Sequence, residues 1–212
     1  IVTNNQFNGK GQKNNKWISE PFKNLTFSFY KILEDRKIQN PFIINCIISL
    51  TIFKALEQFG VTNLRVKWPN DILSDSKKIS GILIENFYRK SFLYSSIVGI
   101  GININQTNFG SLDNVSSVLL STGKSNNIND FFSFLKTLIK KDIQKKTYLP
   151  PEKVLSDYES KLYKKNIDSK FKIGDEIVSG SIVGICKTGK LIVTTSKYGE
   201  KKYNYKEIIL IN

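Results

Sequence analysis

The strongest constraint on the fold is a pair of long strand-forming segments in the middle of the chain. Lys78–Tyr88 and Phe92–Asn105 are rich in β-branched and aromatic residues, and only the charged triplet Arg89-Lys90-Ser91 separates them. Such side chains favour strands, and so short a polar connection favours a tight turn. The sequence therefore predicts two long strands joined by a tight turn.

Shorter patterns predict the elements around this pair. Leu25, Phe27 and Phe29 alternate with polar residues, which indicates a half-buried strand over Asn24–Tyr30. Apolar residues at helical spacing predict a helix over Phe42–Phe59, ended by Gly60. The other predicted elements are a strand tail at Ile1–Asn5, an irregular polar stretch at Gln6–Glu20, a strand at Leu64–Trp68, and helices from about Asn129–Asp130 to Lys146 and over Val154–Lys164.

The pattern changes after Asn166. Four or five short strand-like runs separated by turn residues follow in fewer than 50 residues, which predicts a small β-barrel. These runs are Phe171–Ile173, Glu176–Ile185, Leu191–Ser196 and Lys202–Ile211.

Missing residue types exclude several kinds of chemistry. The 212 residues contain no histidine, which excludes Ser-His-Asp triads and almost every zinc site. The two cysteines, Cys46 and Cys186, lie far apart, so we expect free thiols in a reducing, cytoplasmic compartment. The longest apolar run, Phe42–Phe53, is too short and too often interrupted to span a bilayer.

The net charge of +14 invites a nucleic-acid interpretation, but only three of the 32 basic residues are arginines. Phosphate forks and base recognition favour arginine, whereas lysine is a default surface residue. We therefore expect no nucleic-acid partner for this chain, and we keep a basic nucleic-acid-binding protein as an alternative.

Three segments carry residues suited to chemistry, and the first is the loop Gly9-Lys10-Gly11. Two glycines around a lysine let the backbone approach an anion, with N–H groups and an ammonium directed at it. A plain surface loop is the alternative. No dinucleotide fingerprint or P-loop is present, since Asn14 stands where a third glycine would be.

The second segment is Lys67-Trp68-Pro69-Asn70-Asp71, followed after seven residues by Lys78–Glu85. A carboxylate and an amide near two lysines suit a Mg²⁺–phosphate site. Gly81 within a strand leaves room for a ligand against the backbone. A β-turn with a surface aspartate and a bulge glycine is the alternative.

The third segment is Val98–Asn105, with Gly99 and Gly101 inside a predicted strand and Asn103 at its exit. Interior glycines weaken a strand unless something packs against them. The segment indicates either a ligand-binding strand, with Asn103 reading a base or ribose edge, or a bulge.

Together the three segments resemble the catalytic domain of biotin–protein ligases. That family has a Gly-Arg-Gly loop ending in Trp, then Asn-Leu and a strand, Lys-Trp-Pro-Asn-Asp, Lys-[Leu/Ile]-x-Gly-Ile-Leu-[Val/Ile]-Glu, and Gly-x-Gly-[Ile/Leu]-Asn. The chain matches in this order at Gly9–Gly11, Trp17, Asn24–Ser28, Lys67–Asp71, Lys78–Glu85 and Gly99–Asn103. It departs from the pattern at Lys10, Gln12 and Asn14.

The resemblance implies an α+β fold in which helices pack against one face of a mixed β-sheet, followed by an SH3-like barrel. It implies a catalytic domain at residues 1–166 and a small β domain at 167–212. Methionine is absent and position 1 is isoleucine, so we expect the chain to be part of a longer protein. The family's Ser/Thr-Thr-Asn segment, which contacts biotin, would precede Gln6.

The resemblance also implies an activity: ATP-dependent conversion of biotin to biotinoyl-5′-AMP, then transfer to a lysine of a biotin carboxyl carrier protein. ATP and Mg²⁺ would be required, and no particular oligomeric state or membrane is implied. Lys78, Lys10 and Asp71 would be catalytic, with Asp71 holding Mg²⁺. The implied biotin-binding residues are Gln6, Gly9, Lys10, Gly11, Gln12, Lys78, Gly81, Gly99 and Gly101. The implied ATP-binding residues are Lys10, Gln12, Trp17, Asn70, Asp71, Lys78 and Asn103.

Lipoate–protein ligase is the nearest alternative enzyme, since it shares the fold and the adenylate chemistry. Its Arg-Arg-x-Ser-Gly-Gly-Gly loop and its His-Asp pair are absent from the sequence. The run Lys67–Asp71 is typical of the biotin type, which favours biotin over lipoate.

Overall fold

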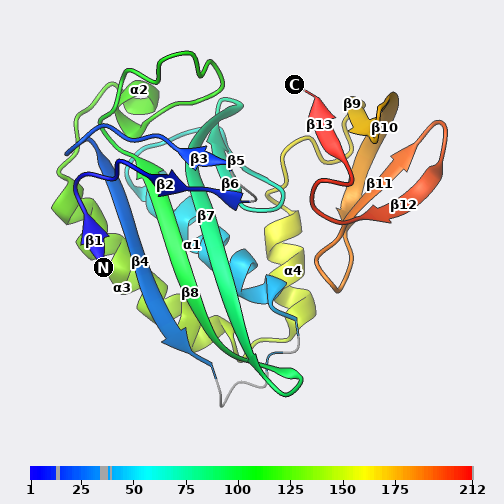
Figure 1. Cartoon of the computed structure of the whole chain (residues 1–212), viewed down its shortest axis with the longest axis horizontal. Coiled ribbons are helices and arrows are strands. Elements are labelled where there is room, and N and C mark those ends of the chain that lie inside the picture. The colour runs from blue at the N-terminus through cyan, green and yellow to red at the C-terminus, as the bar shows by residue number, and fades with distance from the viewer. Residues whose placement is uncertain (13–14, 34–37, 39, 212) are drawn as a thin grey trace.

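The computed structural model describes residues 1–12, 15–33, 38 and 40–211. These residues form a six-stranded sheet backed by helices, a two-stranded hairpin, and a five-stranded sheet near the C-terminus (Figure 1). The strands are β1 (Val2–Thr3), β2 (Gly9–Lys10), β3 (Lys16–Trp17), β4 (Asn24–Ile32), β5 (Leu64–Lys67), β6 (Asp71–Ser74), β7 (Lys77–Arg89), β8 (Phe92–Asn103), β9 (Ser169–Ile173), β10 (Glu176–Ile185), β11 (Leu191–Thr195), β12 (Gly199–Tyr203) and β13 (Ile209–Ile211). The helices are α1 (Phe42–Gln58), α2 (Val118–Thr122), α3 (Ile128–Lys146) and α4 (Pro151–Glu159).

The large sheet has the strand order β1-β4-β8-β7-β6-β5. The two long predicted strands are β7 and β8, and they pair along almost their whole length at its centre. The prediction of a mixed sheet is wrong. Every neighbouring pair of described strands in this sheet is antiparallel. Short turns link β5 to β6, β6 to β7 and β7 to β8, and such turns join antiparallel strands. Parallel pairing within the described residues is confined to isolated bridges.

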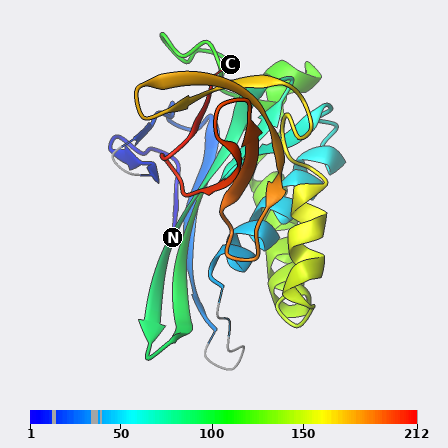
Figure 2. The same cartoon turned by 90° about the vertical axis from the view of Figure 1, so that its right-hand side faces the viewer.

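The helices cover one face of this sheet and leave the other face open (Figure 2). Helix α1 is apolar almost all round, and it lies between strands β5–β7 on one side and helices α3 and α4 on the other. A helix with apolar residues on every side is stable only when it is buried on every side. The core is therefore built around α1, and the face of the sheet away from the helices is the one that can accept a ligand.

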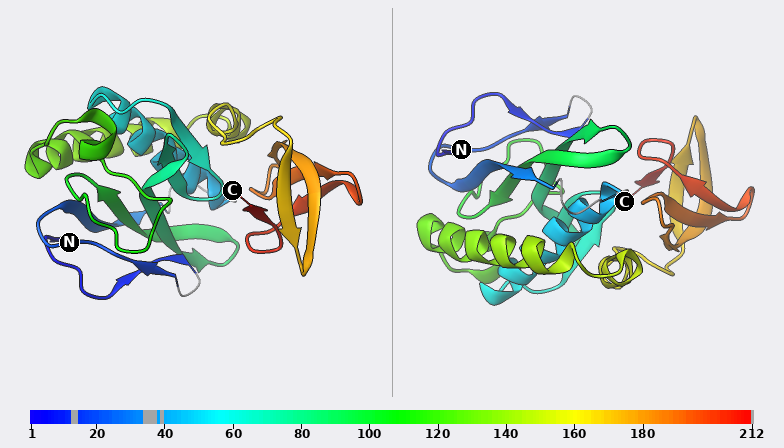
Figure 3. Two further views of the ribbon diagram at one scale, coloured as in Figure 1. Left: turned by 90° about the horizontal axis from the view of Figure 1, so that it is seen from above. Right: turned by 90° about the horizontal axis from the view of Figure 1, so that it is seen from below.

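The C-terminal residues form an antiparallel sheet with the order β12-β11-β10-β9-β13. It lies beside α4, at one end of the large sheet (Figures 1 and 3). The single strand predicted over Lys202–Ile211 is two strands, because a tight turn at Asn204–Glu207 interrupts it. Its buried apolar residues, which include Phe171, Val193 and Tyr203, belong to the same hydrophobic core as those of the large sheet and its helices.

Helix α4 is shorter than predicted. It starts at Pro151 and ends at Glu159, whereas the sequence suggested Val154–Lys164. The residues after it pair with the edge strand β5 instead: Val66 donates to the carbonyl of Lys161 and accepts from the amide of Tyr163. The short elements β2, β3, β6 and α2 were not predicted.

Two further expectations can be compared with the structure. Cys46 and Cys186 are free thiols, as predicted. Among the described residues, no helix combines the length and the apolar character that crossing a bilayer requires.

The start of α3 provides a test of the fold. Asn127 caps this helix, and its side-chain oxygen accepts from the amides of Asn129 and Asp130 at 2.9 and 3.3 Å. The sequence had placed the cap at Asn129–Asp130, two residues later. We expect Asn127→Ala to lower the free energy of unfolding by about 1 kcal/mol in urea denaturation. Asn129→Ala is the matched control and should change it by less than about 0.5 kcal/mol; the reverse ranking would contradict this cap.

Candidate functional site

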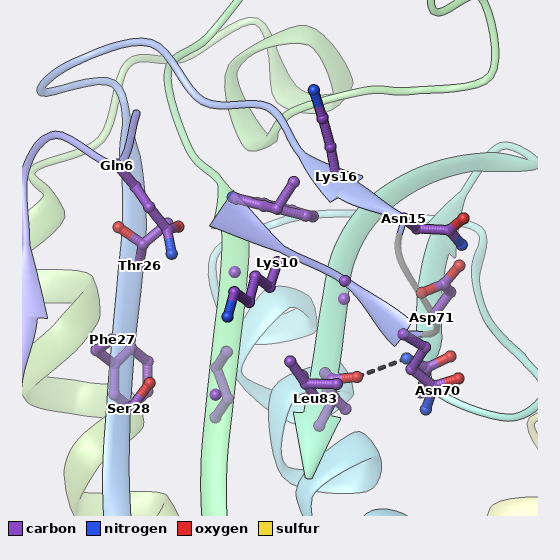
Figure 4. Close-up of a pocket in the computed structure, with 18 of the residues that line it drawn as sticks. Gln6, Lys10, Asn15, Lys16, Thr26, Phe27, Ser28, Asn70, Asp71 and Leu83 are labelled. Carbon is purple, nitrogen blue, oxygen red and sulfur yellow. Dashed lines mark hydrogen bonds between the residues drawn. The ribbon is translucent and has the colours of Figure 1, made fainter. Parts of the chain in front are cut away.

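The open face of the large sheet carries a cavity of about 360 Å³ beneath the β2–β3 hairpin (Figure 4). Its walls come from β1, β2, β3, β4, β7 and β8, from the start of β6, and from the turn after β12. The predicted site residues that line it are Gln6, Lys10, Gly11, Gln12, Trp17, Asn70, Asp71, Lys78, Gly81, Gly99 and Gly101. Segments that are far apart in the sequence thus meet in one cavity.

The floor of the cavity follows the strand register. Thr26 pairs with Gly101, Gly101 with Gly81, and Gly81 with Asp71, so one row crosses four strands. Residues directly opposite in antiparallel strands point to the same face. Two residues without side chains therefore lie between a hydroxyl at one end and a carboxylate at the other, and Lys67 pairs with Asp71 beyond them.

The indole of Trp17 lies on this glycine floor. A Cβ added to Gly101 would come within 2.5 Å of Trp17 Cε2, and one added to Gly81 within 3.4 Å of Trp17 Cζ3. A Cβ on Gly9 would come within 2.5 Å of the Trp17 carbonyl oxygen, so Gly9 is needed for the hairpin to pair. At Gly99 the nearest atom to an added Cβ is 3.5 Å away, which leaves that part of the floor open.

The charges in the cavity are mainly positive. Lys10, Lys16 and Lys78 line it together with a single carboxylate, Asp71. Lys10 projects from β2 across the open face of β8 (Figure 4). Lys78 Nζ lies 2.7 Å from Asp71 Oδ1 and 5.8 Å from the centre of the Trp17 ring. One aspartate cannot neutralise these cations, so the cavity suits an anionic ligand.

The loop that carries Asp71 is held from several sides. The Pro69 carbonyl, which follows a cis Trp68–Pro69 bond, accepts hydrogen bonds from Asn45 Nδ2 and Tyr158 Oη, both at 2.6 Å. Asn70 Nδ2 donates to the Ile82 carbonyl, as the dashed line in Figure 4 marks. This bond uses one of the two N–H groups of the Asn70 side chain and ties it to β7.

Lys67, at the end of β5, pairs with Asp71 across the loop. Burial lowers the pKa of Lys67, and the charges of Lys78 and Lys164 lower it further, against the opposing effect of Asp71. Proximity to other cations is unfavourable for an ammonium unless an anion binds near them. Lys67 therefore adds to the positive potential around Asp71 without lining the cavity.

Comparison with known proteins identifies the fold that carries this cavity. A sequence model described as the biotin/lipoate A/B protein ligase family matches residues 1–103. This match covers just under half of the chain. The Escherichia coli bifunctional ligase/repressor BirA is 26% identical over 196 residues, which are 87% of this chain and 58% of that protein. Arabidopsis thaliana biotin–protein ligase 2 is 33% identical over 110 residues, 49% of this chain and 32% of that protein.

Solved structures agree with this assignment. The biotin protein ligase from Aquifex aeolicus in complex with biotin and ATP superposes with a TM-score of 0.81 at 26% identity, covering 99% of this chain and 87% of that one. The α+β fold with one large sheet and helices on it is thus a biotin ligase fold. The chain spans less than two thirds of the length of the two curated relatives described above.

Not every predicted residue of the biotin/lipoate ligase pattern reaches the cavity. Asn103 is 1% exposed and donates from Nδ2 to the Ser116 carbonyl at 2.9 Å, so it does not line the cavity. The contact between Asn103 and adenine stays a prediction, and Asn103 Oδ1 is buried without a hydrogen-bond partner among the described residues. Gly9 is also outside the lining, and Asn14 lies outside the described residues.

Sequence reasoning missed several lining residues. Thr26 and Ser28 point into the cavity beside Gln6 (Figure 4), and Tyr205 reaches it from the C-terminal sheet. The alternation over Asn24–Tyr30 could have located the first two, since they occupy the face opposite to the buried Leu25 and Phe27. Tyr205 is more than 100 residues from the next lining residue before it in the chain, and no local pattern marks it.

Replacing Gly101 by alanine tests the position of Trp17. The new Cβ would overlap the indole, so the ring must move. In a Trp68→Phe background, where Trp17 is the only tryptophan, we expect its fluorescence to shift to longer wavelength and the free energy of unfolding to fall by about 1–3 kcal/mol. Gly99→Ala, whose Cβ has room, should change neither quantity. Identical emission from the two variants would place the indole elsewhere.

Proposed function

We propose that this chain is the catalytic part of a biotin–protein ligase, which activates biotin with ATP and transfers it to a lysine of a carrier protein. The observation that carries the proposal is the meeting of Lys10 and Lys78 with the Gly81–Gly101 floor in one cavity. The relatives named as biotin–protein ligases, and the related structure with biotin and ATP, support it.

The proposed reaction has two steps. A biotin carboxylate oxygen attacks the α-phosphorus of ATP, and pyrophosphate leaves with the electron pair of the broken P–O bond. The amine of an acceptor lysine then attacks the carbonyl carbon of biotinoyl-5′-AMP, AMP leaves, and the amine loses a proton. Neither step needs a nucleophile from the enzyme, which agrees with a sequence that contains no histidine.

The first step is difficult because two anions must approach each other. The lysines reduce the repulsion between them. In the proposal, Lys78 bridges the carboxylate and the α-phosphate, while Lys10 and the backbone at Gly11 and Gln12 hold the phosphate. Fixed cations directed at a developing charge stabilise a transition state because they need no reorganisation when it forms. The ion pair with Asp71 holds the Lys78 ammonium in place beforehand.

Biotin would occupy the β4 end of the cavity, with Gln6 on its polar side and Gly81, Gly99 and Gly101 beneath it. The indole of Trp17 would cover the pocket or stack on adenine. Two buried polar atoms support a polar ligand here: Trp17 Nε1 and Gln12 Oε1 have no hydrogen-bond partner among the described residues. Buried polar groups are normally paired, so a ligand is a fitting partner for them.

Mg²⁺ is the metal that the proposal requires. The described residues contain no group of three or more side chains of the His, Cys, Asp and Glu types that could hold a metal ion. Magnesium in nucleotide sites often uses one or two carboxylates plus phosphate oxygens, and Asp71, with Asn70 beside it, fits that role. When bound, the ion would neutralise phosphate charge.

Two structural assignments belong to the same proposal. Residues 1–166 would form the catalytic domain and residues 167–212 an SH3-like domain, supported by the separate five-stranded antiparallel sheet of the latter. The acceptor would be a biotin carboxyl carrier protein or domain. A cytoplasmic location is supported by the free thiols of Cys46 and Cys186.

Mass spectrometry of a carrier domain incubated with the protein, biotin and Mg-ATP tests the proposal directly. A mass increase equal to one biotinoyl group supports it, and omission of ATP should abolish the increase. Transfer of lipoate in place of biotin would instead assign the second activity of the family. A carrier that gains no mass with either acid would contradict both activities.

Lys78→Ala tests the charge-neutralisation step. Loss of this ammonium should reduce biotin-dependent ATP–pyrophosphate exchange by at least about 100-fold, while the circular dichroism spectrum stays that of the wild type. Lys77→Ala is the matched control, because Lys77 is the preceding residue of β7, is exposed and does not line the cavity. Similar exchange rates in the two variants would remove Lys78 from the mechanism.

A further inference from the structure

The C-terminal sheet contributes one side chain to the cavity, Tyr205. It sits in the tight turn between β12 and β13, where the amide of Asn204 donates to Glu207 Oε2 at 2.6 Å and its side chain donates to Glu207 Oε1 at 2.8 Å. Lys206 completes the turn with a φ of 72°, in the left-handed region. The turn that presents Tyr205 is therefore closed by its own hydrogen bonds.

The C-terminal sheet is also fixed against the catalytic fold. Trp68 Nε1 donates to the Gly189 carbonyl at 2.9 Å, and Glu159 Oε2 accepts from the amide of Ile185 at 3.2 Å. Gly189 packs so closely on Phe42 that a Cβ there would lie 2.4 Å from the ring. These contacts hold Tyr205 beside the sequence that carries Asp71.

Tyr205 lines the cavity, and its ring is packed against the loop that carries Asp71. Its ring meets Trp68 edge to face, with centroids 6.2 Å apart and planes at 67°. Burial raises the pKa of Tyr205, and the carboxylate of Asp71 raises it further. A tyrosine hydroxyl carries its proton at neutral pH and can donate it in a hydrogen bond.

We propose that Tyr205 is a nucleotide-positioning residue whose hydroxyl donates a hydrogen bond to a phosphate oxygen of ATP at the Asp71 end of the cavity. This inference rests on the proposed ATP-dependent function. It assigns a role to a side chain outside the sequence pattern shared with biotin–protein ligases.

Tyr205→Phe keeps the ring and removes only the donor. ATP–pyrophosphate exchange should show a KM for Mg-ATP raised about tenfold, the effect of one hydrogen bond to a charged group, with the KM for biotin changed less than about twofold. Calorimetric titration with Mg-ATP should show the same loss of affinity without any turnover. Tyr205→Ala should lose at least as much.

Tyr198→Phe is the matched control. The Tyr198 hydroxyl donates to Glu176 in the same C-terminal sheet, and Tyr198 does not line the cavity, so both KM values should stay at the wild-type level. A loss in Tyr205→Ala that is absent from Tyr205→Phe overturns the role of the hydroxyl. An equal rise in both KM values of Tyr205→Phe overturns it as well, since that indicates a general structural effect.

The calorimetric titration separates this inference from the proposed function. Weaker ATP binding in Tyr205→Phe, in a protein that catalyses no exchange with biotin, supports the role of Tyr205 and contradicts the proposed reaction. Wild-type ATP affinity in Tyr205→Phe, together with robust exchange, contradicts the role of Tyr205 and supports the proposed reaction.

Discussion

The row of paired residues across the large sheet is the constraint on which the site depends. Thr26, Gly101, Gly81 and Asp71 lie opposite one another on four strands, so one register sets both the flat floor and the position of the carboxylate. A slip of one residue between β7 and β8 would turn every side chain to the other face. The bulky Ile100 and Ile82, now buried under the helices, would then fill the cavity. The same pairing that buries the core thus creates the space for a ligand.

The charges around that floor explain why the chemistry needs so few special residues. Lys10, Lys16 and Lys78 line the cavity with a single aspartate, which is paired with Lys78, and the half-buried Lys67 adds to their potential. In a partly enclosed site such charges interact more strongly than in water, because little solvent screens them. Two anionic substrates can then share a site that would otherwise keep them apart. Such a cavity fits the proposed reaction, in which bonds form and break only between the substrates. The protein supplies position and charge.

The sequence was most informative where the pattern was long or dense. The periods of α1, β7 and β8 predicted these elements to within a few residues, and the ordered motifs predicted that Lys10 and Lys78 share a site. Local patterns failed where tertiary contacts decide the outcome. The end of α4 depends on pairing with Val66. Tyr205 belongs to a distant turn whose place beside Trp68 exists only in the folded chain.

The five residues Lys67–Asp71 show why a short motif can identify such a fold. Lys67 is a half-buried cation of β5, and Trp68 packs on Tyr205 and hydrogen-bonds the C-terminal sheet. The Pro69 carbonyl joins α1 to α4 through two hydrogen bonds, and Asn70 is tied to the backbone of β7. Asn70 and Asp71 both line the cavity, and Asp71 is paired with a lysine. Each residue meets a different element, so changing any of them disturbs a separate contact. Most of the motif therefore holds together the helices and sheets around the site, and the chemistry depends on that geometry.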